Sequence, residues 1–338
     1  MCVNRMINYG FEDVSNPATD WALQSSLLAS AGITGVALSV GRVEWSAFVQ
    51  RSIPGAYPDS IVQEGSDLVK SAIETLKNSG FTGEIVLSVD ALTPLILKAQ
   101  PELAGMDAKG YPSAVFASAW ALTRGPVGDG LLDFVSEVAQ RYKPTMIGLT
   151  ELMIAEHSYG NRDLALYTQA TGSARWPVTK EGDLDQAHPS LGMWRSLEMA
   201  KLISRLKSAV RQHGVELEVD VRSPDPSQMR GRPDSGHDYA MLLDVADRLA
   251  VWHYVGIDEH SRGFSEEYRG SLKKFKTHQL VLSVGLWAEN GTLSNQELDE
   301  TLQKCKDIPQ LSVTPASLLT EGHWKVLQKH RPKASEGQ

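Results

Sequence analysis

Residues 146–152, MIGLTEL, join a short apolar run to a carboxylate at its end. Met146, Ile147 and Leu149 have the composition of a buried strand, whereas Glu151 stands where that strand would stop. Charged side chains are seldom buried without a partner or a function. The stretch therefore predicts a strand whose C-terminal end carries a functional group.

The same kind of short apolar run recurs along the chain and alternates with longer segments of helical periodicity, which indicates βα units and a parallel sheet. The predicted strands cover residues 5–10, 34–41, 84–90, 146–152, 216–222, 248–254, 279–287 and 310–314. Apolar spacing predicts helices through residues 61–76, 131–142, 193–210 and 242–245, one after the capping box Ser294/Glu297, and a last one opened by Thr314-Pro315.

Eight such units predict an α/β fold of the (β/α)8 barrel type. We expect residues 1–330 to form one catalytic barrel and residues 331–338 a polar tail. Long loops, at residues 91–129 and 153–190, follow the third and fourth strands, at the end of a barrel where active sites form. The main alternative, a doubly wound open sheet, favours a glycine-rich turn, GxGxxG or GxxxxGK[ST], and the sequence contains neither.

Composition narrows the function classes. The 338 residues are 42% hydrophobic and 22% charged, which predicts a soluble globular protein. A net charge of −8 argues against nucleic-acid binding, and no apolar run approaches the roughly 20 residues of a membrane span. We predict no cofactor and no metal. The oligomeric state stays open, as does the compartment, either the cytoplasm or an exported form whose signal has been removed.

Polar and aromatic residues gather at the C-terminal ends of the predicted strands. In chain order these ends carry Tyr9, Arg42 with Glu44 and Trp45, Asp90, Glu151, Asp220 with Arg222, Trp252 with His253 and Tyr254, and Trp287 with Glu289. The strand beginnings, such as GITG at residues 32–35, carry fewer such groups. We therefore expect a ring of functional side chains around one end of the barrel.

Carboxyl pairs at a barrel mouth suit the hydrolysis of glycosidic bonds, because one carboxylic acid protonates the leaving oxygen while the other attacks or activates water. Glu151 is the predicted general acid, with Asp220 as the first choice of partner and Glu289 as the second. The residues predicted to bind the carbohydrate substrate are Tyr9, Glu44, Asp90, His157, Arg222, Trp252, His253, Tyr254 and Trp287. Since neighbouring side chains alternate along a strand, either Trp252 and Tyr254 or His253 alone face the site.

Three stretches carry a resemblance: GLTELM at the fourth strand, AEHSYGNRDLALYTQATGSARWP after it, and VDVR at the fifth. In this layout the chain resembles the (β/α)8-barrel glycoside hydrolases. The resemblance implies that the glutamate ending strand four, Glu151, is a general acid/base. Many members show Asn-Glu at this point, where this sequence has Thr150-Glu151.

Two other functions are compatible with such a barrel. A catalytically silent carbohydrate-binding barrel would keep the aromatic platforms without a coupled carboxyl pair. A lyase or aldolase would need a lysine at a strand end to form a Schiff base, and the predicted strand ends carry none. A metal site in GIDEHSRG, residues 256–263, lacks a second ligand cluster with suitable spacing.

Overall fold

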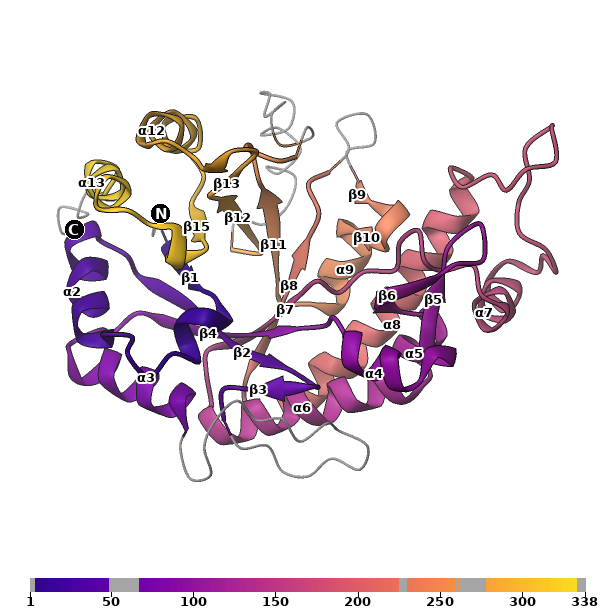
Figure 1. Ribbon diagram of the computed structural model, residues 1–338, viewed down its shortest axis with the longest axis horizontal. Helices are drawn as coiled ribbons and strands as arrows, with labels where there is room; N and C mark the ends of the chain where they lie inside the picture. Colours follow the sequence, from indigo (N-terminus) through magenta and orange to yellow (C-terminus); the bar gives the residue numbers. More distant parts are fainter. Residues whose placement is uncertain (1–3, 49–66, 225–229, 259–260, 262–277, 333–338) are drawn as a thin grey trace.

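Eight parallel strands close into a barrel in the computed structural model, which describes residues 4–48, 67–224, 230–258, 261 and 278–332 (Figure 1). The strands are β1 (Asn4–Tyr9), β2 (Gly35–Arg42), β4 (Glu84–Asp90), β7 (Met146–Thr150), β8 (Glu216–Val221), β11 (Arg248–His253), β12 (Leu280–Gly285) and β15 (Gln310–Thr314). Each pairs with its neighbour along the chain, and β1 pairs with both β2 and β15. The predicted (β/α)8 barrel and its eight strands are confirmed.

Helices follow the strands on the outside of the barrel (Figure 1). Those next to the barrel are α2 (Trp21–Ala31), α3 (Leu68–Asn78), α6 (Pro126–Tyr142), α8 (Pro189–Arg211), α9 (Tyr239–Val245), α12 (Asn295–Lys304) and α13 (Glu321–Lys329). Shorter elements lie in the connections: α1 (Phe11–Val14), β3 (Trp45–Ser46), α4 (Pro94–Ala99), η1 (Pro101–Leu103), β5 (Ala104–Met106), β6 (Pro112–Ala117), α5 (Ala119–Thr123), α7 (Asn161–Thr171), β9 (Gly231–Arg232), η2 (Pro233–Ser235), β10 (His237–Asp238), β13 (Trp287–Ala288), β14 (Gly291–Thr292) and η3 (Ala316–Leu318).

Side-chain caps explain where two of the predicted helices begin. The capping box of α12 is confirmed: the N–H of Ser294 donates to the Glu297 carboxylate, and the N–H of Glu297 donates to Ser294 Oγ. The predicted opening of the last helix at Thr314-Pro315 is wrong. A single 3₁₀ turn follows Pro315, and α13 starts after Thr320, whose hydroxyl accepts the N–H of His323.

Apolar residues on the outer face of the strands form the main core with the helices. Leu87, Ile147 and Leu149, for example, are fully buried in it. A second, small cluster fills the inside of the barrel and consists of Met6, Ala37, Val86 and Met146. Because side chains alternate along a strand, these two clusters fix which strand residues point toward the barrel axis.

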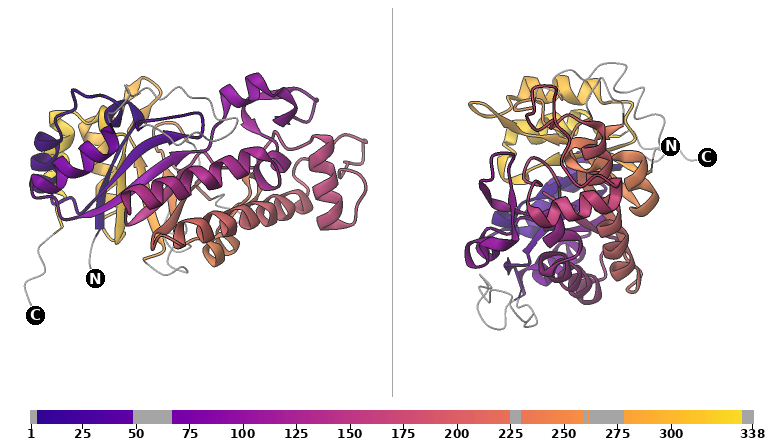
Figure 2. Two further views of the ribbon diagram at one scale, coloured as in Figure 1. Left: turned by 90° about the horizontal axis from the view of Figure 1, so that it is seen from below. Right: turned by 90° about the vertical axis from the view of Figure 1, so that its right-hand side faces the viewer.

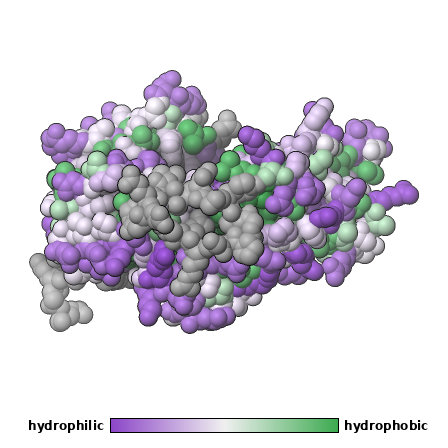
Figure 3. All heavy atoms as spheres, turned by 60° about the horizontal axis from the view of Figure 1, so that its bottom comes forward, coloured by the Kyte–Doolittle hydropathy of each residue, from purple (hydrophilic) through white to green (hydrophobic). Residues whose placement is uncertain are grey.

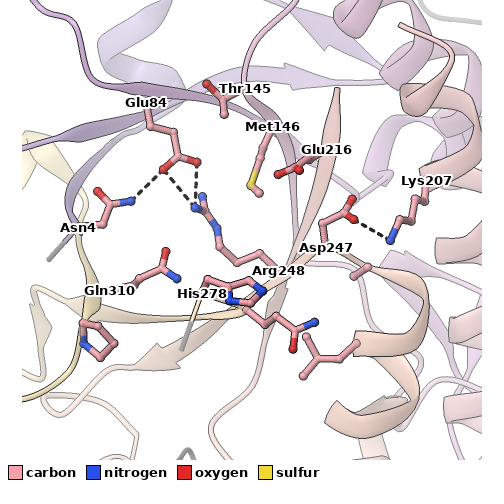
Figure 4. Close-up of a pocket in the computed structure, with 14 residues that line it drawn as sticks. Asn4, Glu84, Thr145, Met146, Lys207, Glu216, Asp247, Arg248, His278 and Gln310 are labelled. Carbon is pink, nitrogen blue, oxygen red and sulfur yellow. Dashed lines mark hydrogen bonds and ion pairs between the residues drawn. The ribbon is translucent and has the colours of Figure 1, made fainter. Parts of the chain in front are cut away.

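Charged residues close the N-terminal end of the barrel (Figure 4). Arg248 begins β11 and is almost fully buried; it pairs with Glu218 and, at 2.8 Å, with Oε1 of Glu84. Asn4 donates a hydrogen bond to Glu84 at 2.9 Å. A cavity of about 640 Å³ opens beside this network, lined in part by Glu216. This end of a (β/α)8 barrel generally serves stability rather than catalysis.

The two long connections contain secondary structure of their own. The first, after β4, carries α4, the antiparallel pair β5–β6 and α5, and the second, after β7, carries α7. Helix α7 lies at the end of the molecule remote from α2, α3 and α13 (Figures 1 and 2). Hydrophilic residues cover most of the described surface on the face seen in Figure 3. Within the described ranges, every helix is too short or too polar to cross a bilayer.

Three predictions fall on residues outside the described ranges. The start of the predicted helix at residues 61–76 lies there, and the described helix α3 begins at Leu68. Residues 333–338 of the predicted tail lie there, as do Glu259 and His260 of the GIDEHSRG stretch.

Candidate active site at the C-terminal mouth of the barrel

Asp90 and Arg42 form an ion pair at the C-terminal ends of β4 and β2. A β-bulge between Ser39 and Gly41 shifts the alternation of β2, so that Gly41 lies opposite Val89 and Arg42 reaches Asp90. The Arg42 guanidinium also stacks over the Trp45 ring, 4.6 Å from its centre. Burial raises the pKa of Asp90, while the N–H of Leu92 and the charge of Arg42 oppose that rise. Sequence reasoning named Arg42 but chose Glu44 instead, because the bulge cannot be read from alternation.

Glu151 follows directly after β7, with a φ of +57°. Thr150 points inward, so regular alternation would turn the next side chain away from the barrel axis. The left-handed backbone breaks that alternation, and Glu151 lies within electrostatic reach of Asp90, Arg42 and Arg222. Burial first, and then the Asp90 carboxylate, raise the pKa of Glu151; the two arginines lower it. A non-glycine residue with positive φ is uncommon and often marks a functional site.

Asp220 points into the barrel from β8, at the level of Thr150 on the neighbouring strand. Burial, the Glu218 carboxylate below it and the Glu151 carboxylate raise the pKa of Asp220 to about 8, against partial opposition from Thr150 and Trp252. The Glu151 carboxylate raises the pKa of Asp220. The charged groups that shift the pKa of Glu151 are Asp90, which raises it, and the two arginines, which lower it. Burial therefore raises the pKa of both carboxyls, and guanidinium groups oppose that rise at Glu151, whereas a second carboxylate adds to it at Asp220.

Three aromatic side chains lie next to this carboxyl pair. The rings of Trp252 and Tyr254 stack with centres 5.4 Å apart, and Trp287 meets Tyr254 edge-on at 5.1 Å. Gly285 leaves room for them, because a Cβ there would lie 2.4 Å from Tyr254 Cδ1. Burial, followed by Asp220 and Glu151, raises the pKa of Tyr254, which places its hydroxyl near both carboxyls. Trp252 and Tyr254 are thus the members of their strand end that face the site.

Two predicted substrate-binding residues lie on the outer face of their strands. Tyr9 is buried against α2, where its hydroxyl donates to Gln24 at 3.0 Å and its ring meets Trp21 edge-on at 5.1 Å. His253 is 1% exposed, on the same face of β11 as the core residue Val251, and burial lowers its pKa to about 4. The structure does not bring either side chain to the barrel mouth.

Three further predicted residues lie in the connections rather than at the carboxyl pair. Glu44 is fully buried, and its Oε1 accepts the N–H of Ile96 at 2.7 Å, at the start of α4. Glu289 is exposed, in the turn between β13 and β14. The His157 ring stacks on Phe116 of β6, with centres 6.1 Å apart. Arg222, in contrast, lies beside Glu151, and its Nη1 donates to Ser235 Oγ at 2.9 Å.

In this arrangement two carboxyl groups in different electrostatic surroundings, two guanidinium groups and an aromatic wall share one end of a closed barrel. Different surroundings are what allow one carboxyl of a pair to donate a proton while the other acts as a base or nucleophile. Among the described residues, no three His, Cys, Asp or Glu side chains are grouped closely enough to hold a metal ion.

Comparison with known proteins gives similarity in fold only. No protein-family model and no curated protein sequence matches the chain. The glycoside hydrolase domain of PgaB (BpsB) from Bordetella bronchiseptica superposes with a TM-score of 0.74 at 10% identity, covering 98% of this chain and 100% of that one. A β-galactosidase from the psychrophilic Marinomonas ef1 gives 0.64 at 13% identity, covering 96% of this chain and 58% of that one. A chitinase from Chromobacterium violaceum gives 0.54 at 10% identity, covering 97% and 99%. The chain therefore resembles the (β/α)8-barrel glycoside hydrolases in fold.

Proposed function

We propose that this protein is a glycoside hydrolase that cleaves an oligo- or polysaccharide, with Glu151 and Asp220 as its catalytic carboxyl pair. The observation that carries the proposal is the placement of two carboxyls in different surroundings at the mouth of a barrel. Glu151 lies within electrostatic reach of Arg42 and Arg222, whereas Asp220, on the adjacent strand, is buried next to the Glu218 carboxylate and its pKa is raised to about 8. An acid next to a carboxylate is what glycoside hydrolysis requires.

We assign the two roles from the surroundings of each carboxyl. Asp220 donates its proton to the glycosidic oxygen as the bond from that oxygen to the anomeric carbon breaks. Glu151, as a carboxylate within electrostatic reach of Arg42 and Arg222, either attacks the anomeric carbon or removes a proton from the attacking water. These roles are the reverse of those suggested by the sequence, which could not show that Arg42, from a distant strand, lies within electrostatic reach of Glu151.

The remaining groups at the mouth suit a carbohydrate. The stacked rings of Trp252 and Tyr254, with Trp287 across them, can cover the apolar face of a sugar. Arg222 and the Arg42–Asp90 pair offer hydrogen bonds to its hydroxyl groups. The names of the structural neighbours, a β-galactosidase and a chitinase, supply the first substrates to test: β-galactosides and β-linked N-acetylglucosamine oligomers.

The roles can be tested with aryl glycosides whose leaving groups differ in acidity. We expect Asp220→Asn to lose about 10²–10⁴-fold in kcat on natural glycans, as general-acid catalysis is lost. It should lose far less on dinitrophenyl glycosides, whose leaving group needs no proton. Glu151→Gln should lose activity on both, and the exposed substitution Glu102→Gln is the matched control.

The pH profile gives a second readout. Activity of the wild type should fall as pH rises through about 8, because Asp220 then loses the proton that it must donate. Equal losses for Asp220→Asn on both kinds of leaving group would contradict the assignment of the acid. Binding of a glycan without any cleavage by the wild type would instead assign a carbohydrate-binding function.

A further inference from the structure

The segment after β8 contains residues that bind the ends of the two strands that carry the proposed carboxyl pair. His237 is fully buried; its Nε2 lies 2.9 Å from the carbonyl oxygen of Leu152, and its Nδ1 lies 3.1 Å from the backbone nitrogen of Arg222. Leu152 directly follows Glu151, and Arg222 directly follows β8. One imidazole ring therefore connects the strand end that carries Glu151 to the one that carries Asp220.

Two neighbours of His237 add bonds at the same two strand ends, to backbone and to the Arg222 side chain. The carbonyl of Ser235 accepts the N–H of Ile154 at 3.0 Å, and its hydroxyl accepts a hydrogen bond from Arg222 Nη1. The Tyr239 hydroxyl donates to the Arg222 carbonyl at 2.6 Å. We call Ser235, His237 and Tyr239 the clamp.

The partners of His237 determine its protonation state. A backbone N–H can only donate, so Nδ1 must accept from Arg222; a carbonyl can only accept, so Nε2 must carry the proton. Only the neutral ring with its proton on Nε2 satisfies both bonds. Burial lowers the pKa of His237 to about 4, which agrees with a neutral ring at pH 7.

The clamp acts on backbone that is strained. Glu151 has a φ of +57°, and its inward direction depends on that conformation. Before it, the Thr150 carbonyl accepts the N–H of Ala91 at 3.0 Å; after it, Leu152 and Ile154 are bound by the clamp. A residue in a sparsely populated conformation persists only when its surroundings hold it there.

We propose that His237 is a positioning residue, which holds the Glu151 carboxylate and Arg222 in register through the backbone of Leu152 and of Arg222. This inference rests on the proposed function, because it assigns His237 a role in the same reaction. His237 is fully buried and acts through the backbone that it binds.

Two conservative substitutions separate its two bonds. The amide nitrogen of His237→Gln can take the place of Nε2 and keep the bond to Leu152, whereas the amide oxygen of His237→Asn can take the place of Nδ1 and keep the bond to Arg222. We expect His237→Asn to lose about 10–100-fold in kcat, because a displacement of the order of 1 Å at a reacting group costs that much. We expect His237→Gln to retain most of kcat and to raise KM through Arg222.

His323 supplies the matched control. It is also buried, and its ring joins the Leu293 carbonyl, at 2.8 Å, to the N–H of Thr320, at 3.2 Å. Its Asn and Gln substitutions should lower the free energy of unfolding by amounts similar to those at His237 and leave kcat unchanged. Equal kcat losses for His237→Asn and His237→Gln, in proportion to lost stability, would show a merely structural role.

A measurement on the wild type separates failure of the clamp from failure of the proposed function. The ¹⁵N shifts of the His237 ring at pH 7 should show a protonated Nε2 and an unprotonated Nδ1. A proton on Nδ1, or an imidazolium ring, would overturn the clamp whatever the activity of the protein. If instead Glu151→Gln cleaves as fast as the wild type while the ring shifts are as expected, the proposed function fails and the hydrogen bonds of the clamp remain established.

Discussion

Asp220→Asn should change how the stability of the protein depends on pH. The pKa of Asp220 is about 8 in the folded protein and near 3.8 in the unfolded chain. Between these values the folded state binds more protons than the unfolded state, so stability falls as pH rises. Below pH 3.8 both states are protonated and the effect vanishes; above pH 8 both are ionised and the loss is complete. Asparagine does not titrate, so the substitution removes this dependence.

The magnitude follows from about 1.4 kcal/mol per unit of pKa difference. By pH 5 the folded state has lost stability equivalent to a little over one unit of the pKa difference between the folded and unfolded states. By pH 8 it has lost the equivalent of nearly the whole difference. The wild type should therefore lose about 3–4 kcal/mol between pH 5 and pH 8 through Asp220 alone. Asp220→Asn should gain that amount relative to the wild type over the same range.

Urea unfolding followed by circular dichroism at pH 5, 6, 7 and 8 measures the difference. Other titrating groups, such as His237 and His253, are present in both proteins and cancel. Any hydrogen bond lost or gained by the amide gives an offset that does not vary with pH. Asp133→Asn, exposed on α6, is the matched control for replacing a carboxylate by an amide. A difference between Asp220→Asn and the wild type that stays flat from pH 5 to 8 would refute the raised pKa, and with it the assignment of Asp220 as the acid.

Two other perturbations have expected outcomes. Arg248→Met leaves the carboxylates of Glu84 and Glu218 without their shared cation inside the barrel, and it should lower the free energy of unfolding by about 3–5 kcal/mol in urea titrations; a loss below 1 kcal/mol would mean that this network does not stabilise the barrel. Gly285→Ala places a methyl group against the Tyr254 ring and should raise the Kd for a bound glycan about tenfold, an overpacking effect measurable by calorimetry; unchanged affinity would remove Tyr254 from the binding surface.

The barrel could be predicted because its strands are short apolar runs with polar residues at one end. That regularity needs no knowledge of tertiary contacts, and it also placed Asp90, Glu151 and Asp220 at a common end. Alternation along β11 correctly limited the choices to Trp252 and Tyr254 or to His253. The direction of Arg248, on the same strand, decides which of the two sets faces the site. Arg248 points inward to pair with Glu218, an interaction that only the closed barrel reveals.

What the sequence could not give depends on local backbone and on long-range charge. The bulge at Gly41, where φ is +125°, turns Arg42 inward, and the left-handed Glu151 departs from the alternation of β7. The types of the neighbouring residues in the sequence predict neither of these two departures. The proposed roles of the two carboxyls depend on Glu218, two residues before Asp220 on the same strand, and on Arg42, which comes from a distant part of the chain; the sequence could name the carboxyl pair but not bring Arg42 to it.

The central claim is that Glu151 and Asp220 cleave a glycosidic bond at the mouth of this barrel. Its most direct test is the hydrolysis of a broad panel of glycans and aryl glycosides by the wild type and by Glu151→Gln, with Glu102→Gln as the control and circular dichroism to confirm folding. We expect the wild type and the control to cleave at least one member of the panel, and Glu151→Gln to lose nearly all of that rate. Cleavage by Glu151→Gln at the wild-type rate would contradict it.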